Sequence, residues 1–417
     1  MVVCLIEAEL PAMGLPASRV AKTLPTRAPW HTLPAAPCIG PHMSPSHPSL
    51  TKRAVMGLLV AAVILGTVEG VLRWMWGPAP NPVQVYGALG AHDGFLDIVD
   101  GEVHRRYGEQ PLPAFPQVHE GPRVGVLGGS SIHEGTPGLP PEEELPGLLA
   151  NRLGVDVVNL GAPGLDSYDL LEITEALETV DFDALVVYTG HNDLGNAVFE
   201  SRYGTLPSAL YAYAYGGLSH LQLFSQLSRL LVPRTGTDRR TRPFMKPKAD
   251  EIQPLDPLRR KITIRAFGRN LERIAWITQR RQQPLVLVVP VSDLTSWPQS
   301  APCEPGHCPP DYFDKARAIT KADPAAAIDI LRHLKDQDPA CVRAPTATET
   351  LVRTVAQQFP HVTLVDPFDA LPKDPTFDIP NRALFIDPVH FSPEGHAALA
   401  TVLEAPVLRA LQAQADR

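Results

Sequence analysis

The feature that most constrains this chain is an alternation of short apolar runs with longer amphipathic segments across residues 123–412. The apolar runs have the length of buried strands and fall at 124–127, 155–160, 184–188, 284–291 and 361–365. Segments with helical spacing lie between or after them, at 141–153, 169–180, 258–279, 346–359 and 392–412. Apolar strands joined by helices are typical of a parallel sheet that is covered on both faces. We therefore predict an α/β fold of three layers.

Two stretches exceed what a minimal flavodoxin-like sheet of this kind requires, and we treat them as insertions at about 205–256 and 300–345. The first holds an apolar, aromatic segment from Leu210 to Leu231. Core packing is the favoured interpretation of that segment, and a lid or a membrane-facing helix are the alternatives. The second holds two predicted helices over 312–340 that resemble a tetratricopeptide hairpin. One such unit cannot form a solenoid, so we expect a helical insertion.

The N-terminal tail, residues 1–53, carries nine prolines before residue 50 and no apolar periodicity. Proline breaks helices, so we expect a disordered tail. Met43 is followed by a polar segment, Lys52, Arg53 and an apolar run, which is the pattern of a natural start. We accordingly hypothesise that translation begins at Met43.

Residues 54–76 form an apolar segment that ends at Trp74 and Trp76 and contains Glu69 near one end. A span needs about 20 apolar residues, and tryptophans are common at membrane interfaces. We predict a transmembrane signal anchor, with a cleaved signal peptide and a buried soluble helix as alternatives. Because Lys52 and Arg53 precede it, the positive-inside rule places the later residues outside the cytoplasm. Residues 77–122 then form a lead-in with a hairpin turn at Asp100-Gly101.

Charge and cysteine content exclude some classes of function. The net charge is −8, from 37 basic and 45 acidic residues, and no long basic stripe is present. Nucleic-acid binding therefore has no electrostatic basis. Cys303 and Cys308 flank a short turn with His307 and leave open a local disulfide, free thiols or a metal site, and Cys341 is a further candidate partner. We expect no metal, because a second pair of ligands is lacking.

Four short segments carry residues suited to chemistry, each after a predicted strand or in a late loop. Ligands of open α/β sheets bind at the carboxyl ends of the strands. Ser130 follows a strand and two glycines, Gly164 lies in a glycine-rich turn, and Asn192 can present side-chain N–H donors. Each of these three segments alone is an ordinary loop.

The fourth segment contains Asp387 and His390, three positions apart. One turn can bring the carboxylate to one imidazole nitrogen, which fixes the tautomer and leaves the other nitrogen free to accept a proton from a serine. Alone, the pair could equally be a surface ion pair. Ser392 is typical of a helix N-cap, and His396 is interpreted as structural.

Together the four segments resemble, in order, the sequence blocks of the SGNH or GDSL-type hydrolase superfamily over roughly residues 123–412. The resemblance implies that Ser130 is the nucleophile and that Asp387 and His390 complete a triad. It further implies an oxyanion hole made by the backbone N–H groups of Ser130 and Gly164 and by the Asn192 side chain. The more specific blocks are Gly190 to Asp193, which contains Asn192, and Asp387 to His390.

The chain departs from the family pattern at its first block, which reads Gly-Gly-Ser-Ser instead of Gly-Asp-Ser-Leu. Shifting the alignment by one residue would make Ser131 the nucleophile, and we prefer Ser130 because two glycines precede it. A Gly-x-Ser-x-Gly elbow is absent, which argues against an α/β-hydrolase.

The resemblance predicts a serine esterase that needs no cofactor. Its expected substrates are ester-bearing small molecules, glycans or lipids, met outside the cytoplasm by a membrane-anchored catalytic domain. The alternatives are an O-acyltransferase of cell-surface polysaccharide, which would use the same triad, and a non-catalytic scaffold built on the helical hairpin. The sequence leaves the oligomeric state open.

Overall fold

The computed structural model describes residues 50–79, 95–105, 113–133, 136–200, 218, 221–231, 255–295, 312–338 and 341–417. The chain divides into two compact units, residues 1–58 and 59–417. The tail before residue 50 lies outside the described residues, as do Cys303, Cys308 and His307, for which a disulfide, free thiols and a metal site were left open. All contacts discussed below belong to the second unit.

The centre of this unit is a parallel sheet of five strands in the order β5-β4-β6-β7-β8. This is the 2-1-3-4-5 order of flavodoxin-like folds. The strands are β4 (Arg123–Gly128), β5 (Asp156–Asn159), β6 (Ala184–Tyr188), β7 (Leu285–Val288) and β8 (Val362–Val365). The predicted parallel sheet is confirmed, with every strand within a few residues of the apolar run that predicted it.

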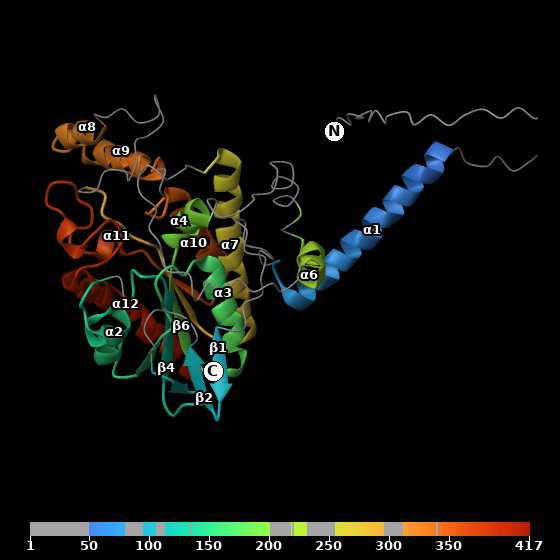
Figure 1. Cartoon of the computed structure of the whole chain (residues 1–417), viewed down its shortest axis with the longest axis horizontal. Coiled ribbons are helices and arrows are strands. Elements are labelled where there is room, and N and C mark those ends of the chain that lie inside the picture. Colours follow the sequence, from blue (N-terminus) through green and yellow to red (C-terminus); the bar gives the residue numbers. More distant parts are fainter. Residues whose placement is uncertain are drawn as a thin grey trace, which may run out of the picture. The chain divides into compact units, whose positions relative to one another are not determined.

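Helices cover both faces of the sheet (Figure 1). Alternate strand residues point to opposite faces, and each set packs in a separate core. On one face Leu127, Leu185 and Leu287 contact α3 (Ser167–Ala176), α7 (Pro257–Arg280) and α10 (Thr346–Gln358). On the other face the strands contact α2 (Leu145–Leu153) and α12 (Pro393–Ala415). The three predicted layers are therefore present.

Two predicted helices differ from the structure at their N-terminal ends. The segment predicted over 141–153 is a short 3-10 turn, η1 (Pro141–Glu143), followed by α2. Glu144 between them is extended, because its buried carboxylate pairs with His133 and because Pro146 favours a new helix start. The helix predicted from residue 169 begins at Ser167, since Asp166 caps it with a capping box. It ends before the 3-10 turn η2 (Leu177–Thr179).

The lead-in contains a small antiparallel sheet of β1 (Leu96–Val99), β2 (Glu102–Arg105) and β3 (Phe115–Pro116). Asp100 and Gly101, both with positive φ, form its hairpin turn. Val103 and Phe115 add to the core on the α3 and α7 side of the main sheet.

The remaining described helices lie in or beside the insertions. They are α4 (Asn192–Glu200), α6 (Gln222–Leu231), α8 (Tyr312–Ile319) and α9 (Pro324–Asp336), with α11 (Pro367–Ala370) and the 3-10 turn η5 (Arg382–Leu384) nearer the C-terminus. Helices α8 and α9 pack together as the predicted hairpin. Cys341 beyond them is a buried free thiol.

The apolar segment predicted over 54–76 lies within one helix, α1 (Leu50–Trp76), which is long and apolar enough to cross a membrane. Its large apolar side chains are exposed along most of the helix. The helix is followed by Gly77, whose φ is +73° and where an added Cβ would lie 2.3 Å from the Trp276 ring of α7. Only glycine permits this close approach, so the end of α1 is packed tightly on α7.

Candidate active site

The serine loop is placed by the end of β4. Gly128 is the last residue of the strand, and a Cβ there would lie 2.6 Å from the Tyr188 carbonyl oxygen of neighbouring β6. A Cβ on Gly129 would lie 2.4 Å from Nδ2 of Asn192. The two glycines are thus required by the close approach of neighbouring groups. Ser130 follows at the carboxyl edge of the sheet.

The structure brings Ser130, His390 and Asp387 together from positions far apart in the sequence. Ser130 Oγ lies 2.7 Å from His390 Nε2, and His390 Nδ1 lies 2.5 Å from Asp387 Oδ2. The His390 side chain is 16% exposed and that of Asp387 is 31% exposed, so solvent or substrate can reach the pair. Ser131, the alternative nucleophile, is buried at 4% exposure. The hydroxyl that meets the imidazole is therefore that of Ser130.

Asp387 is held by its own loop. Its Oδ1 accepts the backbone N–H groups of Val389 and His390 at 2.9 and 2.8 Å, which leaves Oδ2 for the imidazole. Burial by itself would raise the pKa of Asp387, but the His390 hydrogen bond, the His390 charge and the two backbone donors lower it below its usual value. The carboxylate is therefore ionised at neutral pH, as an imidazole partner requires.

Further contacts fix the loop that carries His390. The N–H of Ile386 donates to the His390 carbonyl at 3.0 Å and closes the turn. The hydroxyl of Thr136, which follows the serine loop, donates to the Phe391 carbonyl at 2.5 Å. His396 in α12 accepts the Leu145 N–H, consistent with its predicted structural role, and burial lowers its pKa to about 4. These bonds connect the histidine loop to the segment that follows Ser130.

Asn192 lies beside the serine loop at Gly129, and Gly164 lies in the loop that follows β5. Gly164 has a φ of +78°, which favours glycine, and its carbonyl accepts the Asn196 side chain at 2.9 Å. Asn192 is the first residue of α4, and its Nδ2 donates to the Leu165 carbonyl at 2.8 Å. Nδ2 carries two hydrogens, so one N–H remains for a ligand. The Gly129 contact places that nitrogen against the residue that precedes Ser130.

A buried polar network behind these residues was missed by the sequence analysis. Asp193 Oδ1 accepts the N–H and hydroxyl of Ser167, and the Ser167 hydroxyl also accepts from Asn270 at 3.0 Å. Asn196 connects Gly164 to Asp166 at 2.9 Å. Burial, with the Asp166 charge, raises the pKa of Asp193 to about 7. The available signals were Asp193 at the end of the Gly190–Asp193 block and Asp166 three residues before Asp169, which is a capping-box spacing.

His191 is a second imidazole near His390. It is buried, accepts the Ala344 N–H at Nδ1 at 3.1 Å and lies 3.2 Å from the Tyr188 hydroxyl at Nε2. Burial, followed by the His390 charge, lowers its pKa to about 3. His191 is therefore neutral at pH 7 and adds no positive charge that would oppose protonation of His390.

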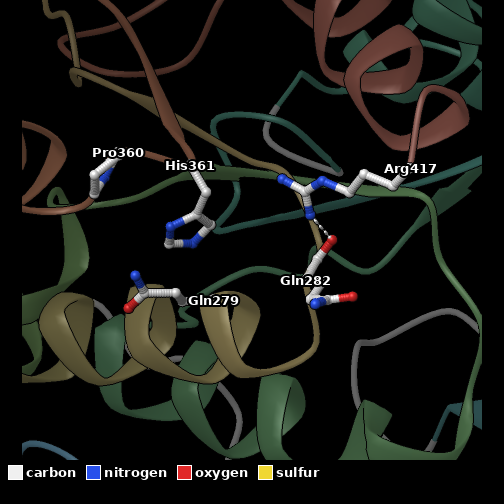
Figure 2. A pocket seen from close by; sticks show the side chains of 5 residues that line it. All are labelled: Gln279, Gln282, Pro360, His361 and Arg417. Carbon is white, nitrogen blue, oxygen red and sulfur yellow. Dashed lines mark hydrogen bonds between the residues drawn. The ribbon is translucent and has the colours of Figure 1, made fainter.

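A cavity of about 380 Å³ lies away from these residues and is lined by Gln279, Gln282, Pro360, His361 and Arg417 (Figure 2). Gln282 precedes β7 and His361 precedes β8, so the cavity is at the amino edge of the sheet. In the described part of the chain, no three His, Cys, Asp or Glu side chains group so as to hold a metal ion.

Comparison with known proteins identifies the family. Residues 127–398 match the model of the GDSL-like Lipase/Acylhydrolase family. The chain belongs to this family. The GDSL-like chain is accordingly an ester-bond hydrolase. This finding opposes the alternative of a non-catalytic scaffold built on the α8 and α9 hairpin. No curated protein matches it.

Solved structures similar to this GDSL-like hydrolase include members of the same family. A putative lipolytic protein of the G-D-S-L family from Desulfitobacterium hafniense is 10% identical, with 68% of this chain and 99% of that chain covered and a TM-score of 0.36. A catalytic mutant of an acetylxylan esterase from Geobacillus stearothermophilus is 14% identical, with 71% and 96% covered and a TM-score of 0.35. A psychrotrophic esterase from Pseudoalteromonas sp. is 12% identical, with 70% and 98% covered and a TM-score of 0.35.

Proposed function

We propose that this hydrolase is a serine esterase whose catalytic triad is Ser130, His390 and Asp387. The observation that carries the proposal is the continuous chain of contacts from Ser130 Oγ to His390 Nε2, at 2.7 Å, and from His390 Nδ1 to Asp387, at 2.5 Å. A hydroxyl, a base and a group that orients the base within bonding reach are the parts that nucleophilic catalysis requires.

In the acylation step, His390 Nε2 takes the proton of Ser130 as Oγ attacks the ester carbonyl. Asp387 keeps the Nδ1–H tautomer and stabilises the imidazolium that forms. The imidazolium then gives its proton to the departing alkoxide, and an acyl-serine remains. Water, deprotonated by His390, releases the acid and restores Ser130. Each step balances without a metal or a cofactor.

The negative charge of the tetrahedral intermediate needs fixed donors. We assign these to the backbone N–H groups of Ser130 and Gly164 and to the Asn192 side chain. The Asn192 amide is held by its bond to the Leu165 carbonyl and by the Gly129 backbone, so little reorganisation is needed when the charge develops. Preorganised donors of this kind are usually the largest electrostatic contribution to acyl transfer.

The proposed substrates are acylated carbohydrates or lipids outside the cytoplasm. Support for this location comes from α1, which is apolar enough to span a membrane, and from Lys52 and Arg53 at its N-terminal end. Positive charges before a span favour a cytoplasmic N-terminus, and the catalytic residues follow the span. The topology is testable by protease digestion of intact cells, where digestion of residues 77–417 from outside is the expected result.

The triad is tested by labelling the full chain with a fluorophosphonate probe. We expect one label, its loss in Ser130→Ala and its retention in Ser131→Ala. Labelling that survives in Ser130→Ala and disappears in Ser131→Ala would move the nucleophile by one residue.

A panel of acetyl, butyryl and long-chain esters and acetylated sugars would define the substrate class. Including a free sugar acceptor separates hydrolysis from acyl transfer, since only transfer yields a new acylated sugar.

A further inference from the structure

Among the described side chains of helix α6, two polar ones are buried and an apolar one is exposed. Gln222 and Ser225 are fully buried, whereas Leu227 is 46% exposed. Leu223 and Phe224, one helical turn before Leu227, are partly exposed on the same face. A helix on the surface of a water-soluble protein turns its apolar face to the core. The described side chains of α6, residues 222–227, show the opposite arrangement, so the face that carries Leu227 suits an apolar environment.

The polar face of α6 is fixed by the C-terminal end of α1. The Gln222 side chain donates to the carbonyls of Gly77 and Pro78 at 2.8 and 3.0 Å. The Glu69 carboxylate accepts the first backbone N–H groups of α6, those of Gln222 and Leu223, both at 2.9 Å. Helix N-termini leave such N–H groups unsatisfied, and a carboxylate is a favoured partner. Glu69 of α1 thus caps the N-terminus of α6.

This arrangement also accounts for an acidic residue inside an apolar helix. The Glu69 side chain is 15% exposed and additionally pairs with Arg73 at 2.6 Å. Glu69 lies seven positions before Trp76, a rise of about 10 Å along the helix. Helices that lie in the membrane interface are buried to a depth of ~5–10 Å. Tryptophans are common at membrane interfaces, so Trp76 marks the membrane surface. Glu69 then lies at the depth of an interfacial helix that begins beside it.

We propose that α6 is an interfacial membrane helix, lying in the headgroup and acyl boundary of a phospholipid bilayer with Leu223, Phe224 and Leu227 toward the lipid. The bilayer is the expected occupant because α6 begins on α1 (Figure 1). The apolar side chains of α1 are themselves exposed, as at Leu58 (71%) and Val63 (68%). The proposal rests on the proposed membrane anchoring. A second membrane contact would restrict rotation of the catalytic unit about the end of α1.

Photocrosslinking in the full chain tests the proposal. Benzoylphenylalanine is introduced at position 227 of the chain, which is then reconstituted in phosphatidylcholine and phosphatidylglycerol vesicles that contain a fluorescent phospholipid. Position 408 is the matched control, because Leu408 of α12 is also a leucine and is 44% exposed. Position 60 in α1 reports the anchor. We expect strong lipid labelling at 60 and 227 and at least tenfold less at 408.

The outcomes separate the inference from the anchor on which it rests. If position 60 is labelled by lipid but labelling at 227 is no stronger than at 408, the membrane role of α6 is overturned and the anchor stands. An absence of labelling at both 60 and 227 overturns the anchor as well. A crosslink from 227 to a second protein chain instead of lipid would assign this face to a protein partner and also overturn the proposal.

A Glu69→Ala variant provides an independent measurement. Loss of the carboxylate should expose the first N–H groups of α6 and lower lipid labelling at 227 severalfold, with labelling at 60 unchanged. Turnover of a soluble ester should also be unchanged, because Glu69 is not part of the proposed catalytic machinery. Undiminished labelling at 227 would refute the capping of α6 by Glu69.

Discussion

Two hydroxyl–imidazole pairs lie at opposite edges of the parallel sheet. At the carboxyl edge, Ser130 Oγ lies 2.7 Å from His390 Nε2. At the amino edge, Thr278 Oγ1 lies 2.9 Å from His361 Nε2, beside the cavity of Figure 2. The pairs resemble each other in distance, and the amino-edge pair borders a cavity of about 380 Å³.

The difference lies in what surrounds each pair. His390 has Asp387 at Nδ1, whereas Nδ1 of His361 is buried without a hydrogen-bond partner among the described residues. The Thr278 hydroxyl is also within hydrogen-bonding distance of the Ile274 and Ala275 carbonyls, which accept from it. Burial and the Arg417 charge lower the pKa of His361, although the Ala275 carbonyl opposes them. The amino-edge pair therefore lacks the orienting carboxylate that Asp387 supplies to the proposed base, His390.

The strongest test of this comparison is Ser130→Ala. We expect kcat for a short-chain ester to fall by a factor on the order of 10⁴ or more, because the nucleophile is removed. Steady-state hydrolysis of a chromogenic acetate measures it. His390→Ala should give a similar loss, and the double variant should add little, since the two residues act as a unit. A Ser130→Ala enzyme with near-normal kcat would contradict the proposed triad.

The next effect in size is expected from Asn192→Ala. Loss of one oxyanion donor typically lowers kcat by about 10²–10³. KM should change little, because the donor acts mainly in the transition state. Gly129→Ala should reproduce much of this loss. The new Cβ would lie 2.4 Å from Asn192 Nδ2, so the amide would have to move. An unchanged kcat in Asn192→Ala would remove this side chain from the oxyanion hole.

A smaller effect on turnover, with a distinct pH signature, is expected from Asp193→Asn. Because burial and Asp166 raise the pKa of Asp193 to about 7, the folded protein retains this proton where the unfolded chain releases it. The stabilisation from Asp193 is therefore complete below about pH 4 and is lost as the pH rises towards 7. Asparagine cannot titrate and can still accept from Ser167. The melting temperature of Asp193→Asn should thus fall less between pH 4 and 7 than that of the parent, and parallel curves would contradict this origin of the pH dependence.

The smallest effect is expected at the amino edge. Thr278→Val keeps the shape of the side chain and removes its hydroxyl, so stability should fall by about 1 kcal/mol. kcat should equal that of the parent, because the His361 pair lacks the orienting carboxylate. Chemical denaturation and the same ester assay measure both quantities. A large loss of kcat would show that the two edges of the sheet are functionally coupled.

Sequence patterns predicted the fold class because strand and helix periodicities are local. The run 184–188 is uniformly apolar and became the central buried strand β6. Ser130, Gly164 and Asn192 follow predicted parallel strands, whose carboxyl ends share one edge of the sheet, and the resemblance to the GDSL-type family singled them out there. Asp387 and His390 were identifiable as a pair because three positions suffice for a turn.

Other features depended on contacts between distant segments. The helix predicted over 141–153 is interrupted at Glu144 because that carboxylate pairs with His133, a contact that no local pattern encodes. Likewise, the network joining Asp166, Asp193 and Asn270 draws on three separate helices or their ends.

The sequence by itself determined the α/β class, the apolar helix near the N-terminus and the residues that reach the carboxyl edge of the sheet. Each of these follows from periodicity, length or the direction of parallel strands. Tertiary structure alone decided that Ser130 rather than Ser131 meets His390, why glycine is needed at 129, and that α6 leaves Leu227 exposed. Those outcomes depend on which groups fill the space around a residue, and only the packed chain fixes that.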